Sequence, residues 1–285
     1  MEVLTPRTKL VVLDDVTSNT ALPMPVEAIC AACRAHGALT LVDAAHSAAS
    51  RSHPHLPFLA HADFAAGNLH KWACAPRGAG FLWARREHQH ILEPPLISHG
   101  YGGGFASSFI WSGANDYSPL LALPSLLRGW WGAAPAAPAA PAAPAAPAAF
   151  AAAPTGATTA TAAHTAADPA AFPVHLPLAR SVAYQRRLLR DATTVLADAW
   201  GTQPLLPPSA CYHMALVELP SGLRDADGGR LTTSKAVQDA LHYAHAVECP
   251  VKTVGGRLYV RASAAVYNEI ADYQRLANAV LTMRG

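Results

Sequence analysis

Two short stretches decide the fold of this chain, ALTLVD at residues 38–43 and FAAGNLHKW at residues 64–72. Each begins as an apolar run with the length of a buried strand and ends in residues whose side chains are able to react with a ligand or bind it. Asp43 ends the first stretch, and Lys71 follows the apolar part of the second. A lysine amine can form an imine with an aldehyde, and a carboxylate can hold a protonated pyridine nitrogen. The pair predicts the two contacts that an aldehyde cofactor with a pyridine ring needs.

The surrounding sequence has the pattern of an α/β sheet. We expect strands at residues 9–13, 38–43, 63–67 and 78–84 and an amphipathic helix at residues 26–36. Strands and a helix joined by short connections are typical of a mostly parallel sheet with helices on both faces. In such sheets, ligands bind beyond the carboxyl ends of the strands. Four side chains fall there: Ser18, Asp43, His46 and Lys71.

A low-complexity segment divides the chain. Residues 132–172 repeat Ala-Ala-Pro and then become rich in Ala and Thr. Proline at every third position excludes a helix, and few large side chains are available to form a core. We therefore expect a polyproline-II-like or disordered insertion. It separates a partial large domain at residues 1–131 from a small C-terminal α/β domain at residues 173–285.

The small domain has a pattern of its own. We expect helices at residues 178–200, 233–246 and 269–283 and strands at residues 212–219 and 257–262. Thr233 is placed to cap the second of these helices, because threonine is a preferred residue at a helix N-terminus.

Composition excludes several classes of function. Charged residues make up 14% of the chain and hydrophobic residues 51%, which favours a buried core. The net charge of +2 gives no electrostatic basis for binding nucleic acid. No apolar stretch is long enough to span a bilayer, and residues 1–7 are not a signal peptide. We therefore expect no nucleic-acid or membrane partner, and a cytoplasmic location.

Cysteine and histidine patterns give no case for a metal. The odd number of cysteines, five, indicates a reducing compartment. Cys30 and Cys33 form a CxxC pair inside the expected helix at residues 26–36, so we interpret them as packing residues. Five histidines are dense in one span, but their spacing matches no ligand set. They are His46, His53, His55, His61 and His70.

Six motifs carry a resemblance to a known family. They are VDAAH (42–46), GNLHKW (67–72), APRGAGFLW (75–83), SHGYG (98–102), FIWSGANDYS (109–118) and RLYVRASAAVYNE (257–269). Together they resemble the class V aminotransferases, which are fold-type I enzymes that use pyridoxal phosphate. The resemblance is strongest to isopenicillin N epimerase-like and hercynylcysteine sulfoxide lyase-like proteins, with cysteine desulfurases as more distant relatives. It covers nearly everything outside the Ala/Pro-rich insertion.

This resemblance implies roles around the ring of the cofactor. Lys71 matches the Schiff-base lysine, and Asp43 matches the acid that keeps the pyridine nitrogen protonated. His46 matches a His or Gln that lies beside the ring and its phenolic oxygen. Ser18, or its neighbour Thr17, falls where the family places a polar contact to that oxygen.

The resemblance also implies contacts to phosphate and substrate. Asn68 and His70 match residues that contact the phosphate beside the lysine. Arg261 matches the arginine that binds the α-carboxylate of an amino-acid substrate, and its planar fork suits bidentate binding of a carboxylate.

Two departures from the family pattern stand out. Sequences of family members extend well to the N-terminal side of the position that matches Met1. The chain therefore resembles an N-terminally truncated member that lacks a phosphate cradle. Ala114 stands where the family has a threonine that contacts the phosphate of the partner subunit. Residues 112–117 match the segment that reaches across the dimer interface, so we expect a homodimer.

Several functions stay open from the sequence. The leading hypothesis is an enzyme that uses pyridoxal phosphate at Cα or Cβ of an amino acid or a sulfur-containing derivative, as an epimerase or a C–S lyase. Transamination is a further outcome of the same chemistry. One alternative is a degenerate, catalytically impaired homologue or a gene fragment. Another is a cysteine desulfurase, for which Cys249 is the candidate nucleophile.

Overall fold

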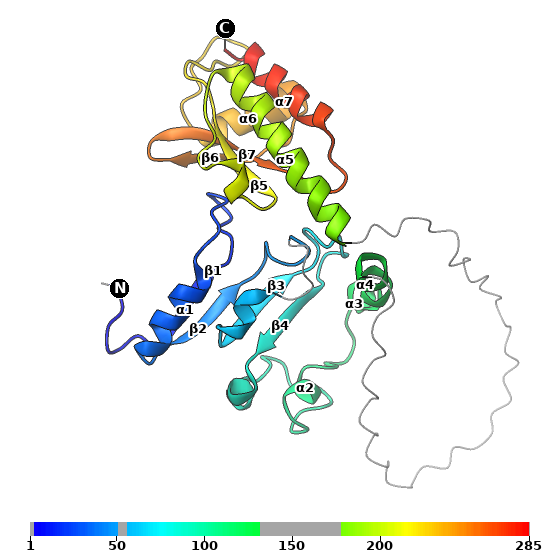
Figure 1. Ribbon diagram of the computed structural model, residues 1–285. Helices are drawn as coiled ribbons and strands as arrows, with labels where there is room; N and C mark the ends of the chain where they lie inside the picture. The colour runs from blue at the N-terminus through cyan, green and yellow to red at the C-terminus, as the bar shows by residue number, and fades with distance from the viewer. Residues whose placement is uncertain (1–2, 51–55, 132–177, 285) are drawn as a thin grey trace, which may run out of the picture.

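The first sheet has the mostly parallel arrangement that the sequence predicts. The computed structural model describes residues 3–50, 56–131 and 178–284 (Figure 1). The strands are β1 (Leu10–Asp14), β2 (Leu39–Asp43), β3 (Phe64–Asn68) and β4 (Gly80–Ala84), in that order across the sheet. The first three run parallel, and β4 is antiparallel to β3. The Ala/Pro-rich insertion lies outside the described residues, and the domain limits stay a prediction.

Helix α1 (Val26–Ala35) covers one face of this sheet. Val26 and Cys30 of the helix pack in one cluster with Leu13 and Val42 of the strands. The short helix η1 (Pro57–Ala60) adds Phe58 to the same cluster. Cys30 and Cys33 are both buried, with 1% and 2% of their surface exposed, and both are free thiols. They serve as packing residues, in agreement with the sequence interpretation.

The opposite face of the sheet is open. Leu10, Val12 and Leu82 have 48%, 63% and 44% of their surface exposed. The sequence predicted helices on both faces, and parallel sheets are normally covered on both. Within the described parts of the chain, however, α1 and η1 cover one face alone. Asp43 points to the open face, because strand side chains alternate and its neighbour Val42 is buried under α1.

A second, antiparallel sheet forms the C-terminal part. Its strands are β5 (Met214–Glu218), β7 (Arg257–Ser263) and β6 (Val251–Val254), in that spatial order. Three helices pack on it: α5 (Leu178–Trp200), α6 (Ser234–His245) and α7 (Ile270–Thr282). Side chains with no exposed surface form the centre of this core: Leu189, Leu196, Val217, Val237, Leu241, Val260 and Val280.

Short helices join these units and were not predicted. They are η2 (Arg86–Ile91), α2 (Phe105–Ser108), α3 (Ser118–Leu121), α4 (Leu123–Trp131) and η4 (Pro208–Ala210). Such short elements have too few turns to show a hydrophobic period in the sequence. No helix in the described part of the chain is both long and apolar enough to cross a membrane.

The two sheets meet through an apolar cluster and a few polar contacts. Val16, Trp72 and Val182 belong to this shared cluster, together with Met214 at the start of β5. In Figure 1, the connection after β1 rises from the lower sheet toward β5 of the upper one. The loop between the sheets is therefore where side chains from the two halves of the chain converge.

The N-terminus of α6 offers a local test of the fold. The Thr233 hydroxyl accepts a hydrogen bond from the Ala236 amide at 3.2 Å. We expect Thr233→Ala to lower the free energy of unfolding by about 1 kcal/mol, because it removes this cap. Urea denaturation measures the change. Thr232→Ala alters the neighbouring exposed threonine, which has no capping bond, and an equal loss in both variants would contradict the capping role.

Candidate active site

Lys71 lies in the turn after β3, at the edge of a cavity of about 400 Å³ between the two sheets. His46 and His70 line this cavity from the first sheet, and Arg261 and Met214 line it from the second. The cavity is therefore built from residues up to about 215 positions apart, His46 and Arg261. It brings together three of the predicted site residues with the predicted substrate arginine.

Asp43 lies close enough to influence the charge of Lys71. Burial lowers the pKa of Lys71, and the negative charges of Asp43 and Asp14 oppose that effect. The Asp43 carboxylate accepts a hydrogen bond from the Ala45 amide at 2.9 Å and is exposed on the open face of the sheet. Asp43 does not line the Lys71 cavity, and its pairing with a cofactor beside Lys71 stays a prediction.

Asp14 is a second carboxylate at this edge, which sequence analysis missed. It pairs in register with Asp43 across β1 and β2. Burial raises the pKa of Asp14, and the nearby charge of Asp43 raises it further. Like Asp43, Asp14 lies at the end of a predicted strand, and this position is the sequence signal that could have identified it as a site residue.

His46 connects Lys71 to Trp72. The His46 Nε2 atom is 3.4 Å from Lys71 Nζ, and His46 Nδ1 accepts a hydrogen bond from the Trp72 indole at 3.2 Å. Burial lowers the pKa of His46 to about 4, and the positive charges of Lys71 and Arg261 act in the same direction. The imidazole is therefore neutral at physiological pH.

The two predicted hydroxyl residues differ in their surroundings. Ser18 contacts Arg261, which donates to both its backbone carbonyl and its hydroxyl. Thr17 makes its contacts within its own loop. Its hydroxyl lies 2.6 Å from the Thr20 hydroxyl and accepts a hydrogen bond from the Leu22 amide at 2.9 Å. Of the two, Ser18 lies nearer the Lys71 cavity, through Arg261.

Three polar atoms around Lys71 are buried and lack a hydrogen-bond partner among the described residues. They are Asn68 Oδ1, His70 Nδ1 and Arg261 Nε. Leaving a buried polar atom unpaired costs about 1–3 kcal/mol, so each of these atoms is able to accept a polar partner such as a ligand or a water molecule. Arg77, which the sequence analysis did not single out, adds a further positive charge to the cavity wall.

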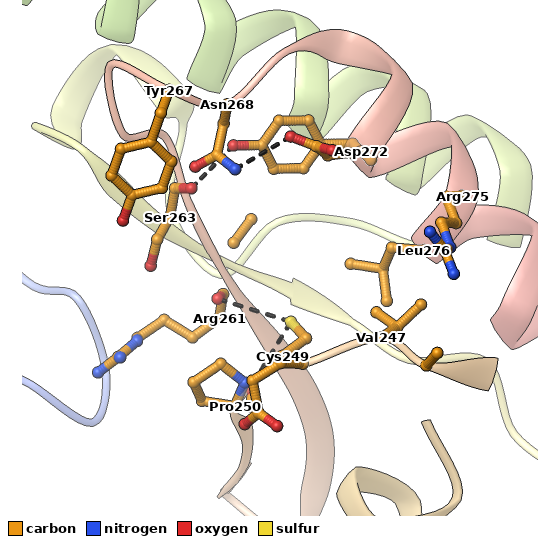
Figure 2. A pocket seen from close by; sticks show the side chains of 14 residues that line it. Val247, Cys249, Pro250, Arg261, Ser263, Tyr267, Asn268, Asp272, Arg275 and Leu276 are labelled. Atoms are coloured by element: carbon orange, nitrogen blue, oxygen red, sulfur yellow. Dashed lines mark hydrogen bonds between the residues drawn. The ribbon is translucent and has the colours of Figure 1, made fainter. Parts of the chain in front are cut away.

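Cys249 is unsuited to attack a substrate. It is 6% exposed, and its sulfur lies 3.8 Å from the backbone carbonyl oxygen of Arg261. Burial raises the pKa of its thiol to about 12, so the reactive thiolate is scarce. Figure 2 shows Cys249 against a second cavity of about 370 Å³, with the Arg261 side chain extending away from it.

Residues 109–117 form an exposed loop. The Tyr117 hydroxyl donates to the Gly113 carbonyl at 2.8 Å, and the Trp111 indole donates to the same carbonyl at 2.9 Å. Ile110 and Trp111 have 65% and 52% of their surface exposed, and Ala114 is exposed as well. Exposed apolar side chains of this kind are compatible with a protein interface, and the dimer stays a prediction.

A metal centre has no basis in the described residues. Within them, no group of three or more His, Cys, Asp or Glu side chains is close enough to hold a metal ion. His53 and His55 lie outside the described residues. The remaining histidines of the dense span have separate surroundings, since His61 approaches Glu27 at 3.8 Å whereas His46 contacts Lys71.

Comparisons with known proteins identify relatives of this chain. The family described as "Aminotransferase class-V" matches residues 1–108. The L-cysteine desulfhydrase of Arabidopsis thaliana is 30% identical over 95% of this chain and 54% of that protein. The isopenicillin N epimerase of Amycolatopsis lactamdurans is 38% identical over 34% of this chain and 24% of that protein. Residues 1–108 of this chain belong to the class V aminotransferase family.

Solved structures give the same fold for this class V chain. The cystine C–S lyase C-DES has a TM-score of 0.64 at 17% identity, over 99% of this chain and 63% of that one. The cysteine desulfurase of Thermococcus onnurineus has a TM-score of 0.63 at 21% identity, over 97% and 60%. The predicted fold class is confirmed. This chain spans about half the length of its plant relatives.

The cavity fits the cofactor of the class V family, which is pyridoxal phosphate. Positive charge from Arg77 and Arg261 suits anionic phosphate and carboxylate groups, and the Lys71 amine suits an aldehyde. The unpaired Nδ1 atom of His70 is an additional polar contact that a ligand in this cavity can satisfy, whereas Asn68 lines a neighbouring cavity on the open face of the sheet.

A second buried histidine beside the site is expected to make the folded protein less stable in acid. The His213 ring packs against Trp72 in a tilted arrangement, and its Nε2 atom donates to the Ala49 carbonyl at 3.3 Å. Burial lowers the pKa of His213 from 6.5 to about 4, so the unfolded chain takes up this proton more readily. We expect stability to fall as the pH drops from about 6.5 toward 4, with His213 contributing about 3 kcal/mol at most.

Urea denaturation at several pH values measures this loss. His213→Gln retains an amide donor for Ala49 and removes the titrating ring, so its stability should depend less on pH in this range. His90→Gln replaces an exposed histidine and serves as the control. Equal pH dependence of wild type and His213→Gln would rule out this role.

Proposed function

We propose that this class V chain takes part in cleaving the Cβ–S bond of L-cysteine or a related amino-acid thiol, with release of sulfide. The proposal rests on the convergence of Lys71, His46 and Arg261 on one cavity between the two sheets. It is supported by four plant relatives whose names describe established, probable or putative L-cysteine desulfhydrases, each aligned over at least 95% of this chain.

The chain offers a set of residues that would hold pyridoxal phosphate. Lys71 would bind its aldehyde, and Asp43 would bind its pyridine nitrogen. Asn68, His70 and Arg77 would be the polar residues available to its phosphate. When bound, the cofactor supplies an electron-accepting ring that eases removal of a proton from the substrate Cα.

The protein itself would orient the substrate and move that proton. Arg261 is free to bind the substrate carboxylate through its unpaired Nε, while its terminal nitrogen contacts Ser18. Fixing the carboxylate determines which bond of Cα faces Lys71. Lys71 Nζ would then accept the Cα proton, after which a sulfur group on Cβ can leave.

Epimerisation is the second candidate, because it begins with the same proton transfer. The match to isopenicillin N epimerases is higher in identity but is limited to about a third of this chain. A homodimer and a cytoplasmic location remain predictions. A catalytically impaired homologue also remains open, because Ala114 has no hydroxyl where the family has a threonine.

Lys71→Ala tests attachment of the cofactor. We expect borohydride treatment to fix pyridoxal phosphate covalently to the wild-type chain and not to Lys71→Ala, because the variant lacks the amine. Mass spectrometry locates the added mass. Lys235→Ala removes an exposed lysine of α6 and should behave as wild type. Retention of a reducible adduct in Lys71→Ala would exclude Lys71 as the attachment site.

Cys249→Ser separates the lyase from a desulfurase. A lyase that works from Lys71 needs no protein thiol, so we expect Cys249→Ser to release sulfide from cysteine at a rate within about twofold of wild type. A sulfide assay without added reductant measures this rate. Cys74→Ser, which alters an exposed thiol, is the matched variant. A persulfide trapped on Cys249 during turnover would favour the desulfurase instead.

A further inference from the structure

The contact between Trp72 and His46 determines which nitrogen of His46 carries a proton. An indole nitrogen is a donor only, so the Trp72 hydrogen bond of 3.2 Å requires His46 Nδ1 to accept. A neutral imidazole carries one proton. That proton must therefore lie on Nε2, the atom that faces Lys71.

This tautomer also determines the role of Lys71 in their contact. The Nε2–H group of His46 can only donate, so at 3.4 Å the Lys71 nitrogen must accept. An ammonium group has no lone pair and cannot accept a hydrogen bond. The contact therefore favours Lys71 as the neutral amine, which is the form that reacts with an aldehyde.

We propose that Trp72 is a positioning residue that fixes His46 as an Nε2–H donor and thereby favours the amine form of Lys71. This inference deepens the proposed function, because it concerns the lysine that would bind the cofactor. The order of groups is Trp72 Nε1–H, then His46, then Lys71 Nζ. Trp72 acts through His46 and has no contact of its own with the lysine amine among the hydrogen bonds of the described residues.

The indole is held firmly enough for this role. Trp72 has 8% of its surface exposed and lies in the cluster that joins the two sheets. Its ring packs against His213 with centroids 4.9 Å apart at an angle of 55°. Rotation of the indole away from His46 would break this packing, so the hydrogen bond has a defined direction.

Other charges around Lys71 act against one another. Asp43 and Asp14 favour the ammonium form, whereas burial and the positive charge of Arg261 favour the amine. The hydrogen bond from His46 therefore acts on a lysine whose pKa is already lowered, chiefly by burial. Removing it is expected to shift the balance by about one pH unit, a tenfold change in the ratio of amine to ammonium.

The first experiment uses the wild-type chain without cofactor. Nitrogen-15 NMR of labelled histidine distinguishes protonated from unprotonated ring nitrogens, and His46→Gln assigns the His46 signals by their loss. At neutral pH we expect Nε2 to be protonated and Nδ1 to be unprotonated. A proton on Nδ1 would overturn the proposal, and this measurement does not depend on whether Trp72→Phe folds.

The second experiment measures the pKa of Lys71 from the pH dependence of its acylation, followed by mass spectrometry. Trp72→Phe keeps an aromatic ring against His213 but removes the donor, so the pKa of Lys71 should rise by about one unit. Trp200→Phe is the control, because it removes another buried indole donor, to the Ala277 carbonyl at 3.2 Å, in the second core.

An unchanged pKa of Lys71 in folded Trp72→Phe would overturn the proposal, as would an equal rise in Trp200→Phe. Both experiments work on the chain alone. A failure to bind pyridoxal phosphate or to release sulfide would contradict the proposed function, but the protonation of His46 and the pKa of Lys71 would still be measurable. Failure of the proposed function is therefore distinguishable from failure of the inference about Trp72.

Discussion

The parallel register of β1, β2 and β3 is the constraint on which the rest of the site depends. Asp14 pairs with Asp43, and Asp43 pairs with Ala66, two residues before the end of β3. Parallel strands end at the same edge of a sheet, so the turns that follow them emerge side by side. A shift of one residue in β2 would turn Asp43 to the face under α1, because strand side chains alternate.

Charges of both signs act on Lys71 at this edge. Asp43 and Asp14 favour its ammonium form, and Arg261 favours the amine. Since Asp43 is exposed on the open face of the sheet, water and salt weaken its attraction for Lys71. Partial burial of Lys71 also favours the amine, because it disfavours the charged form. The proposed hydrogen bond from His46 acts in the same direction as burial and Arg261.

The second sheet completes the site from a distance. Arg261 of β7 reaches the loop after β1 and contacts Ser18, while Met214 of β5 packs in the same cluster as Trp72. This arrangement makes the substrate arginine depend on how the two sheets pack together. The first sheet also has an open apolar face within the described residues, and plant relatives of this class V chain are about twice as long.

The sequence by itself determined the order of elements and most of the candidate residues. The apolar runs placed the strands of the first sheet within about two residues, and the period of residues 178–200 predicted α5 with the observed bounds. Lys71, Asp43, His46 and Arg261 were found because they lie in or beside such strands and match family motifs.

Only the tertiary structure decided which of these residues act together. The contact between Ser18 and Arg261 joins positions 243 residues apart, and no local pattern encodes such a pair. The same holds for the protonation of His46, which depends on where the Trp72 indole is held by His213. Local sequence encodes strands and turns through short-range preferences, whereas the protonation of a side chain depends on burial and neighbours that appear only when the chain is packed.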